Sequence, residues 1–262
     1  MLNKRWPNTT GPRLRGGLSA LSTYRTTRLL FLVSIESITT GSGCVISRTD
    51  AYHIQMVMPP AVQLLETMRV SEGEIFLLKR HMERIWRSSQ DLGFVCDTDV
   101  IGAAIWTTGV RQTEPVVLRF LLSQDGSHEI QVKPLPPEGR PAYLKLSSVV
   151  VDSNDPLLRH KTTARAVYEK AREGCSEDAD AILVNERGEI TETSILNIAA
   201  MRDGVWITPP VSCGLLPGTM RAELLDEGSI REGVILAQDL VPGEMVRCFN
   251  AVRGVMDVPF RP

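Results

Sequence analysis

The sequence lacks the features that are typical of several classes of protein. Its 262 residues include five cysteines, widely spaced and without a CxxC pair, which argues against a disulfide framework or a zinc site and favours the reducing cytoplasm. Basic residues are not in excess, since 29 lysines and arginines stand against 31 acidic residues. The longest strongly apolar run, residues 29–35, is far shorter than the roughly 20 residues that a membrane helix needs. We therefore expect a cytoplasmic protein that acts on a small molecule, without nucleic acid or a membrane as partner.

Common catalytic motifs are also missing. The sequence contains no GxSxG, no GxxxxGK[ST], no HExxH and no GxGxxG after an expected strand. The hydrolase, kinase and zinc-enzyme interpretations therefore lose their usual support, and no metal site is expected. What is present is an ordinary globular composition, 43% hydrophobic and 23% charged. A chain of this length can form two modest domains.

The first fifty-odd residues differ from the rest in charge. They combine many Ser, Thr and Gly residues with a series of basic residues, and their acidic residues are Glu36 and Asp50. We expect residues 1–56 to be a disordered or non-core extension. Such an extension could also arise from a misplaced start codon, in which case the true start lies near Val57 or Met58. The alternatives are an Arg-rich organellar transit peptide and a signal peptide with residues 29–35 as its apolar core.

Residues 57–137 have the pattern of a smaller first domain. A Ser-Glu-Gly-Glu turn separates two apolar runs, and an Asp-Gly turn separates two more, which predicts two hairpins. Between the hairpins, apolar residues recur at helical spacing and stop at Gly93, a favoured C-terminal cap. The expected elements are strands at 62–70, 75–78, 116–123 and 128–135 and helices at 82–92 and 97–109.

A proline-rich stretch, residues 134–141, predicts the join to a larger second domain, residues 138–262. This domain also mixes apolar runs of strand length with stretches at helical spacing, without internal repeats. The mixture predicts the α+β class. The expected elements are strands at 143–151, 181–184, 190–193 and 195–200 and helices that begin at Thr162 and Thr219.

Five short stretches along this pattern carry a family resemblance. They are HMER at 81–84, HKTTAR at 160–165, GEITETSILN at 188–197, CGLLPGTMR at 213–221 and FNAVRG at 249–254. In order and spacing they resemble the signature blocks of the class IV pyridoxal-phosphate enzymes, which include aminotransferases and aminodeoxychorismate lyases. The resemblance covers residues 62–258. It implies a two-domain fold-type IV enzyme with a small α/β domain and a larger, β-rich cofactor-binding domain.

The resemblance implies pyridoxal 5'-phosphate as the cofactor. Lys161 would form the Schiff base with the cofactor aldehyde and later move protons at the substrate carbon, which needs an amine whose pKa can be lowered. Glu192 would pair with the pyridine nitrogen and keep it protonated. Without the resemblance, the simpler interpretations are a solvated lysine at a helix start and an exposed strand glutamate.

The resemblance also implies a site for the cofactor phosphate and ring. Arg84 could bind two phosphate oxygens at once, although an isolated arginine on a helix is more simply a solvated one. Gly218 precedes an expected helix, whose free amides suit a phosphate dianion. Leu216 would pack against the ring. The expected residues are Arg84, Leu216, Thr219, Met220, Asn250 and Ala251.

Within the family, the residues after Lys161 favour a lyase. Branched-chain aminotransferases typically carry a tyrosine five residues after the lysine, whereas this chain has Ala166 there. An arginine four residues after the lysine, Arg165 in this chain, resembles the pattern of the lyases. The resemblance therefore implies 4-amino-4-deoxychorismate lyase, which gives 4-aminobenzoate and pyruvate for folate synthesis. Arg165 and Arg253 are candidates to bind the two substrate carboxylates. The alternatives are an aminotransferase for branched-chain or D-amino acids and a non-catalytic member that keeps only the fold.

The approach to the first block departs from the family. A YGDG-like segment is common there, whereas residues 58–67 read MPPAVQLLET, so the resemblance implies no substrate contacts from that edge. This shortened segment resembles that of lyase modules fused to aminodeoxychorismate synthase, which implies a functional link to that enzyme. Leu196 also stands where the family commonly has a small polar residue. By resemblance alone, we expect a homodimer.

Overall fold

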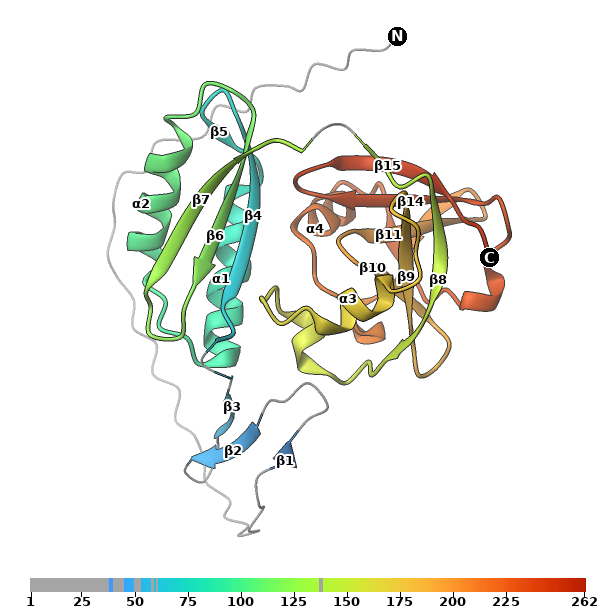
Figure 1. The fold of residues 1–262 in the computed structure, drawn as a ribbon, viewed down its shortest axis with the longest axis horizontal. Helices are drawn as coiled ribbons and strands as arrows, with labels where there is room; N and C mark the ends of the chain where they lie inside the picture. Colours follow the sequence, from blue (N-terminus) through green and yellow to red (C-terminus); the bar gives the residue numbers. More distant parts are fainter. Residues whose placement is uncertain (1–37, 40–44, 50–52, 58, 60, 137–138) are drawn as a thin grey trace. The chain divides into compact units, whose positions relative to one another are not determined.

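The computed structural model describes residues 38–39, 45–49, 53–57, 59, 61–136 and 139–262 (Figure 1). The predicted N-terminal extension lies largely outside these residues. In this part of the chain the structure describes three strands that form an antiparallel sheet of their own: β1 (Ile38–Thr39), β2 (Val45–Thr49) and β3 (His53–Val57).

A four-stranded antiparallel sheet and two helices form the part of the molecule that the sequence assigns to the first domain. The strand order is β5-β4-β6-β7. Apolar residues from β4, β6 and both helices form one buried core, as expected when helices cover one face of a sheet. The elements are β4 (Leu64–Ser71), β5 (Glu74–Ile75), α1 (Leu78–Leu92), α2 (Thr98–Gly109), β6 (Val116–Leu122) and β7 (His128–Pro134).

Local sequence signals explain the ends of these helices. Gly93 caps α1 with a φ of 72°, a left-handed conformation that glycine adopts without strain. The Asp97 side chain accepts hydrogen bonds from the amides of Asp99 and Val100 at the start of α2. Both predicted helices are confirmed. The predicted strand at 75–78 is wrong beyond Ile75, because the chain turns at Leu77 and α1 begins at Leu78.

An eight-stranded sheet forms the larger part. Its main path is β13-β12-β11-β10-β9-β8, and β14 pairs with both β11 and β15. An isolated bridge between Leu144 and Phe260 brings β15 beside β8, so the strands curl back on themselves around a second apolar core. The strands are β8 (Tyr143–Val151), β9 (Ala179–Asn185), β10 (Ile190–Thr193), β11 (Asn197–Arg202), β12 (Val205–Thr208), β13 (Arg231–Glu232), β14 (Met245–Asn250) and β15 (Gly254–Pro259).

Two short helices connect the parallel pairs of this sheet. The parallel strands β8 and β9 are joined through α3 (Ala166–Arg172), and β12 and β13 through α4 (Thr219–Asp226). The predicted helix at Thr219 is confirmed, but the helix predicted from Thr162 begins four residues later. Residues 161–163 are extended instead, because they pair with the start of β4: Leu65 N–H donates to Lys161 O (2.9 Å) and Thr163 N–H donates to Gln63 O (2.9 Å).

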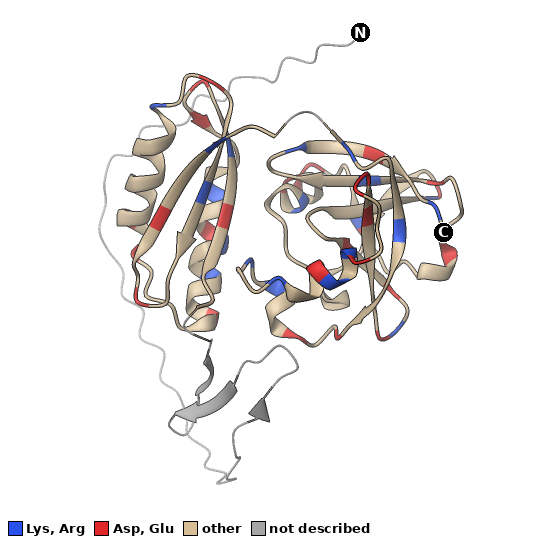
Figure 2. Cartoon of the chain, in the orientation of Figure 1, with Lys and Arg blue, Asp and Glu red and all other residues tan. Residues whose placement is uncertain are grey.

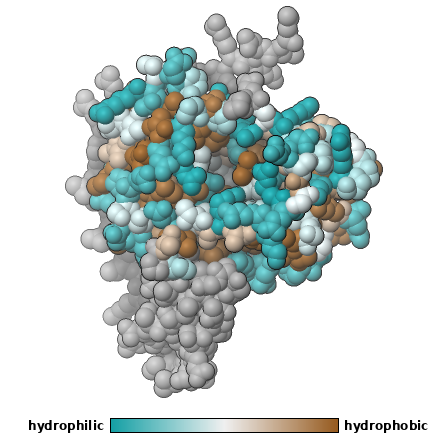
Figure 3. Space-filling model, viewed as in Figure 1, coloured by the Kyte–Doolittle hydropathy of each residue, from teal (hydrophilic) through white to brown (hydrophobic). Residues whose placement is uncertain are grey.

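Charged and apolar residues are mixed over the described surface. Lysines and arginines are scattered among acidic residues over both parts of the described chain (Figure 2). On the face shown in Figure 3, apolar residues lie among hydrophilic ones. Two large aromatic side chains of the described residues are exposed, Trp86 at 51% and Trp106 at 57%. None of the described helices is both long and apolar enough to cross a membrane.

Candidate active site

One pocket of about 220 Å³ brings together residues that lie far apart in the sequence. It is lined from β4, α1, the segment before α3, β10, the start of α4 and the turn after β14. All the residues that the sequence singled out line it, so their proximity is observed while their individual roles remain predictions. They are Arg84, Lys161, Arg165, Glu192, Leu216, Thr219, Met220, Asn250, Ala251 and Arg253.

The backbone around Lys161 is fixed on both sides. A 3-10 helix (Pro156–Arg159) precedes it, and the extended residues that follow pair with β4. The side chain lines the pocket. Desolvation is the main cause that lowers the Lys161 pKa from 10.5 to about 8, and the positive charge of Arg84 is the second. The nearby carboxylates partly oppose this shift. At mildly alkaline pH, about half of this amine is therefore neutral and nucleophilic.

Glu192 is held by three hydrogen-bond donors. Tyr168 Oη and the amide of Leu216 donate to Oε1, at 2.9 and 3.1 Å, and Asn197 Nδ2 donates to Oε2 at 3.0 Å. Burial raises the Glu192 pKa from 4.5 to about 7, although the donors act to lower it. A carboxylate oxygen can accept two hydrogen bonds, so Oε2 retains one acceptor position for a ligand.

Glu66 was missed by the sequence reasoning, and it holds two of the residues that line the pocket, Arg84 and His81. It lies between Leu64 and Met68 on the core face of β4 and is 2% exposed. Arg84 Nε donates to its Oε1 at 2.8 Å, and Arg84 Nη2 donates to its Oε2 at 2.6 Å. Burial alone would raise the Glu66 pKa, but the charges and hydrogen bonds of Arg84 and His81 hold it at about 2. The missed signal was a charged residue at an inward position of a strand.

His81, one turn before Arg84 on α1, also lines the pocket without having been predicted as a functional residue. Its ring is 1% exposed, and Nδ1 lies 2.6 Å from Glu66 Oε2. Burial lowers the His81 pKa despite the neighbouring carboxylate. The ring is therefore mainly neutral at pH 7, with Nδ1–H donated to Glu66. Nε2 is buried and has no hydrogen-bond partner among the described residues.

The start of α4 suits an anion. Gly218 is the residue before the helix, and Thr219 and Met220 supply its first amides, which have no partner within the helix. A Cβ at position 218 would lie 1.9 Å from Asn197 Oδ1, so only glycine fits there. Arg84 Nη1 reaches the same loop and lies 3.5 Å from Pro217 O.

The turn after β14 borders the same pocket. Asn250 Oδ1 accepts hydrogen bonds from the amides of Val252 (3.0 Å) and Arg253 (2.8 Å), which fixes the turn. Asn250 Nδ2 donates to Ile195 O at 3.1 Å. Ala251 and Arg253 therefore face the pocket from a turn that is tied to the β10–β11 connection.

Both predicted substrate arginines line the pocket, and each is already hydrogen-bonded to a backbone carbonyl. Arg165 donates to Ser194 O and lies over the Tyr168 ring, 4.6 Å from its centroid. Arg253 donates to Gly139 O. Neither Lys161 nor Arg165 lies within a helix, because α3 begins at Ala166. The extended segment nevertheless places both side chains at the pocket.

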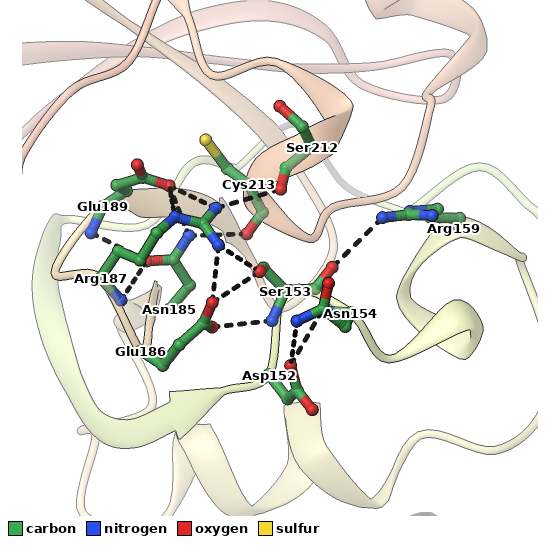
Figure 4. Close-up of polar contacts among 10 residues, drawn as sticks. All are labelled: Asp152, Ser153, Asn154, Arg159, Asn185, Glu186, Arg187, Glu189, Ser212 and Cys213. Carbon is green, nitrogen blue, oxygen red and sulfur yellow. Dashed lines mark hydrogen bonds and ion pairs between the residues drawn. The ribbon is translucent and has the colours of Figure 1, made fainter.

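A polar network joins three segments that continue along the chain to pocket residues (Figure 4). The guanidinium of Arg187 donates to Ser153 Oγ at 2.5 Å, to Glu189 Oε2 at 2.7 Å and to Ser212 O at 3.1 Å. Asn185 Nδ2 donates to Cys213 O at 3.0 Å. These bonds hold together the segments that continue along the chain to Lys161, Glu192 and Leu216.

Comparisons with known proteins agree with this architecture. A family model described as "Amino-transferase class IV" matches residues 63–259. A Schizosaccharomyces pombe protein named "Putative aminodeoxychorismate lyase" is 34% identical over 193 residues, which cover 70% of this chain and 84% of that protein.

Solved structures share the fold. That of a "Putative amino-acid aminotransferase" from Mesorhizobium loti has a TM-score of 0.70 and 35% identity, and covers 76% of this chain and 99% of its own. The 4-amino-4-deoxychorismate lyase from Pseudomonas aeruginosa has a TM-score of 0.66 over 76% of this chain and 83% of its own. At 20% identity, the second likeness concerns the fold alone.

Proposed function

Because the chain belongs to the class IV aminotransferase family, we propose that it is a pyridoxal-phosphate-dependent 4-amino-4-deoxychorismate lyase. The chain is an enzyme of the lyase or aminotransferase kind, and its α+β fold is that of the fold-type IV enzymes, as the sequence predicted. One observation carries the finer assignment: Arg165 lines the pocket with Lys161, and Ala166 replaces the tyrosine of branched-chain aminotransferases. The lyase-named relative supports the same choice.

The residues of the pocket fit pyridoxal 5'-phosphate. Lys161 offers an amine with a lowered pKa for the aldehyde, and Glu192 keeps one acceptor position for the ring nitrogen. The first amides of α4 would hold the phosphate together with Arg84 Nη1, the guanidinium nitrogen that does not donate to Glu66. When bound, the cofactor supplies an electron-accepting ring that acidifies the carbon bearing the substrate amine.

The protein's own residues would then carry out the proton transfer and the orientation. Lys161 removes the proton from the amine-bearing ring carbon, the C–O bond to the enolpyruvyl group breaks, and the six-membered ring becomes aromatic. The departing enolpyruvate takes up a proton and becomes pyruvate. Pairing with the protonated ring nitrogen would favour the charged form of Glu192, while Arg165 and Arg253 would bind the two substrate carboxylates.

The proposal is tested by mixing the protein, pyridoxal phosphate and aminodeoxychorismate without any 2-oxo acid. We expect 4-aminobenzoate and pyruvate in equal amounts. Arg165→Gln should lower kcat/KM by roughly 100-fold, because a charge-assisted hydrogen bond contributes about 2–3 kcal/mol. Products that form at an undiminished rate in Lys161→Ala would contradict the mechanism.

An aminotransferase is the second candidate, because the similar Mesorhizobium loti protein carries that name. Such an enzyme would release a 2-oxo acid from a branched-chain or D-amino acid, and it would turn over only when a second 2-oxo acid is supplied, with ping-pong kinetics. Turnover of aminodeoxychorismate without an acceptor separates the two reactions.

We also propose that the enzyme is a homodimer that serves folate synthesis together with aminodeoxychorismate synthase. Light scattering of the purified protein tests the dimer. Supply of the substrate by the synthase, followed by release of 4-aminobenzoate in a coupled assay, tests the functional link.

A further inference from the structure

Tyr168 occupies a position between two charged pocket residues. It lies on α3 and lines the pocket. Its hydroxyl donates to Glu192 Oε1 at 2.9 Å, and its ring lies beneath the guanidinium of Arg165, 4.6 Å from centroid to Cζ. One side chain therefore contacts both the group expected at the cofactor ring and the group expected at a substrate carboxylate.

The hydroxyl determines which oxygen of Glu192 can meet a ligand. With donors from Tyr168 and the Leu216 amide, Oε1 has both acceptor positions filled, whereas Oε2 receives only Asn197 Nδ2. The Tyr168 pKa is well above 10, because the phenol is buried and lies beside Glu192. Tyr168 therefore acts as a donor throughout the working pH range and keeps Oε2 as the ligand-facing oxygen.

The ring determines where the Arg165 guanidinium lies. Arg165 is also held by its hydrogen bond to Ser194 O, so the aromatic face and one carbonyl together fix the plane of the cation. A guanidinium that is fixed in advance loses less entropy when it binds a carboxylate. The hydroxyl and the ring therefore have separable tasks.

We propose that Tyr168 is a positioning residue with two tasks: its hydroxyl aims Glu192 Oε2 at the ring nitrogen of the cofactor, and its ring aims Arg165 at a substrate carboxylate. This inference rests on the proposed function. Its first half concerns cofactor binding alone and does not depend on which reaction follows.

The first task is tested with pyridoxine 5'-phosphate, which has the ring nitrogen and phosphate but no aldehyde for Lys161. Equilibrium dialysis should show roughly tenfold weaker binding to Tyr168→Phe than to the wild type, since a hydrogen bond to a charged group is lost. An analogue with C–H in place of the ring nitrogen should bind both proteins equally. Tyr143→Phe is the matched control, because it removes a hydroxyl that bonds Ser176 Oγ at the surface.

The outcomes of this test are distinct. A loss that is equal for both analogues, or equal in Tyr143→Phe, would overturn the first task, because it would indicate a general structural effect. Undiminished binding to Tyr168→Phe would overturn it as well. If the wild type binds neither analogue, the cofactor assignment fails together with the inference.

The second task is tested by comparing Tyr168→Phe with Tyr168→Leu. The phenylalanine keeps the aromatic face, so its KM for aminodeoxychorismate should stay within twofold of the wild type. The leucine should raise KM roughly fivefold, as expected for the loss of a cation–π contact. Equal KM values in the two variants would overturn the second task, and failure of the wild type to consume the substrate would overturn the proposed function along with it.

Discussion

At the scale of single residues, the site depends on a buried carboxylate that no signature block contains. Glu66 neutralises Arg84 and fixes His81 from a strand position that otherwise carries apolar residues. Sequence patterns alone could not assign this role, because the three side chains meet only when α1 packs on β4. By contrast, Lys161 and Glu192 could be predicted from their short surrounding motifs.

The depressed pKa of Glu66 predicts how stability depends on pH. A pKa near 2 in the folded state, against about 4.5 in the unfolded state, contributes roughly 3 kcal/mol above pH 5. This contribution should be lost as pH falls from about 5 to 2. In Glu66→Gln, denaturant unfolding should therefore show lower stability at pH 7 and a flatter decline in acid.

Glu83→Gln is the control for this prediction, because Glu83 lies on α1 with a side chain that is 51% exposed. Its stability should follow that of the wild type. Parallel acid curves for the wild type and Glu66→Gln would contradict the buried ion pair.

The lowered pKa of Lys161 predicts how cofactor attachment depends on pH. Only the neutral amine attacks an aldehyde, so the attachment rate should rise about tenfold per pH unit up to a pH of about 8 and then level off. Stopped-flow absorbance with pyridoxal phosphate measures this rate. A rate that continues to rise to pH 10 would show an unperturbed lysine.

At the scale of elements, sequence patterns predicted the regular pieces better than the segments that bear the site. Helix α1, helix α2 and the β6–β7 hairpin carry their own caps and turns, so local signals sufficed. The segment around Lys161 looked helical but is extended, because its backbone bonds go to β4. Such a long-range pairing leaves no local trace, and the same holds for the Arg187 network (Figure 4).

The close contact between Gly218, at the start of α4, and Asn197 yields a prediction about cofactor binding. In Gly218→Ala, the new Cβ would meet Asn197 Oδ1 at 1.9 Å and push away a residue that bonds both Glu192 and Leu216. We expect pyridoxal phosphate to bind at least tenfold more weakly by equilibrium dialysis. Gly102→Ala is the control, since its Cβ would meet only Met82 Cε at 3.7 Å, and it should bind normally with slightly higher stability. Equal binding to both variants would contradict the role of the loop.

At the scale of the whole molecule, the pocket is built from two sheets that are joined at the site itself. The pairing of β4 with residues 161–163 is one connection, and Arg80 provides another through ion pairs with Glu223 (2.7 Å) and Asp226 (2.8 Å) on α4. The sequence predicted two domains, and we propose that they meet at the proline-rich linker. The family resemblance, and not the pattern of helices and strands, predicted which side chains line the pocket.

This construction predicts a cooperative response to the cofactor. A ligand that contacts residues from both sheets should stabilise them together, by about 2.7 kcal/mol at a concentration of 100 times Kd. Scanning calorimetry should therefore show a single transition that moves upward with pyridoxal phosphate. A transition that splits, with only one part shifted, would indicate a site confined to one sheet.

The most direct test of the central claim is a visible absorption spectrum of the protein with pyridoxal phosphate, followed by addition of aminodeoxychorismate. We predict a cofactor band that depends on Lys161 and changes on addition, while 4-aminobenzoate accumulates. Lys161→Ala should show neither the band nor the product. A stable band without product would contradict the lyase reaction and favour an aminotransferase, whereas the absence of any band in the wild type would contradict the cofactor site itself.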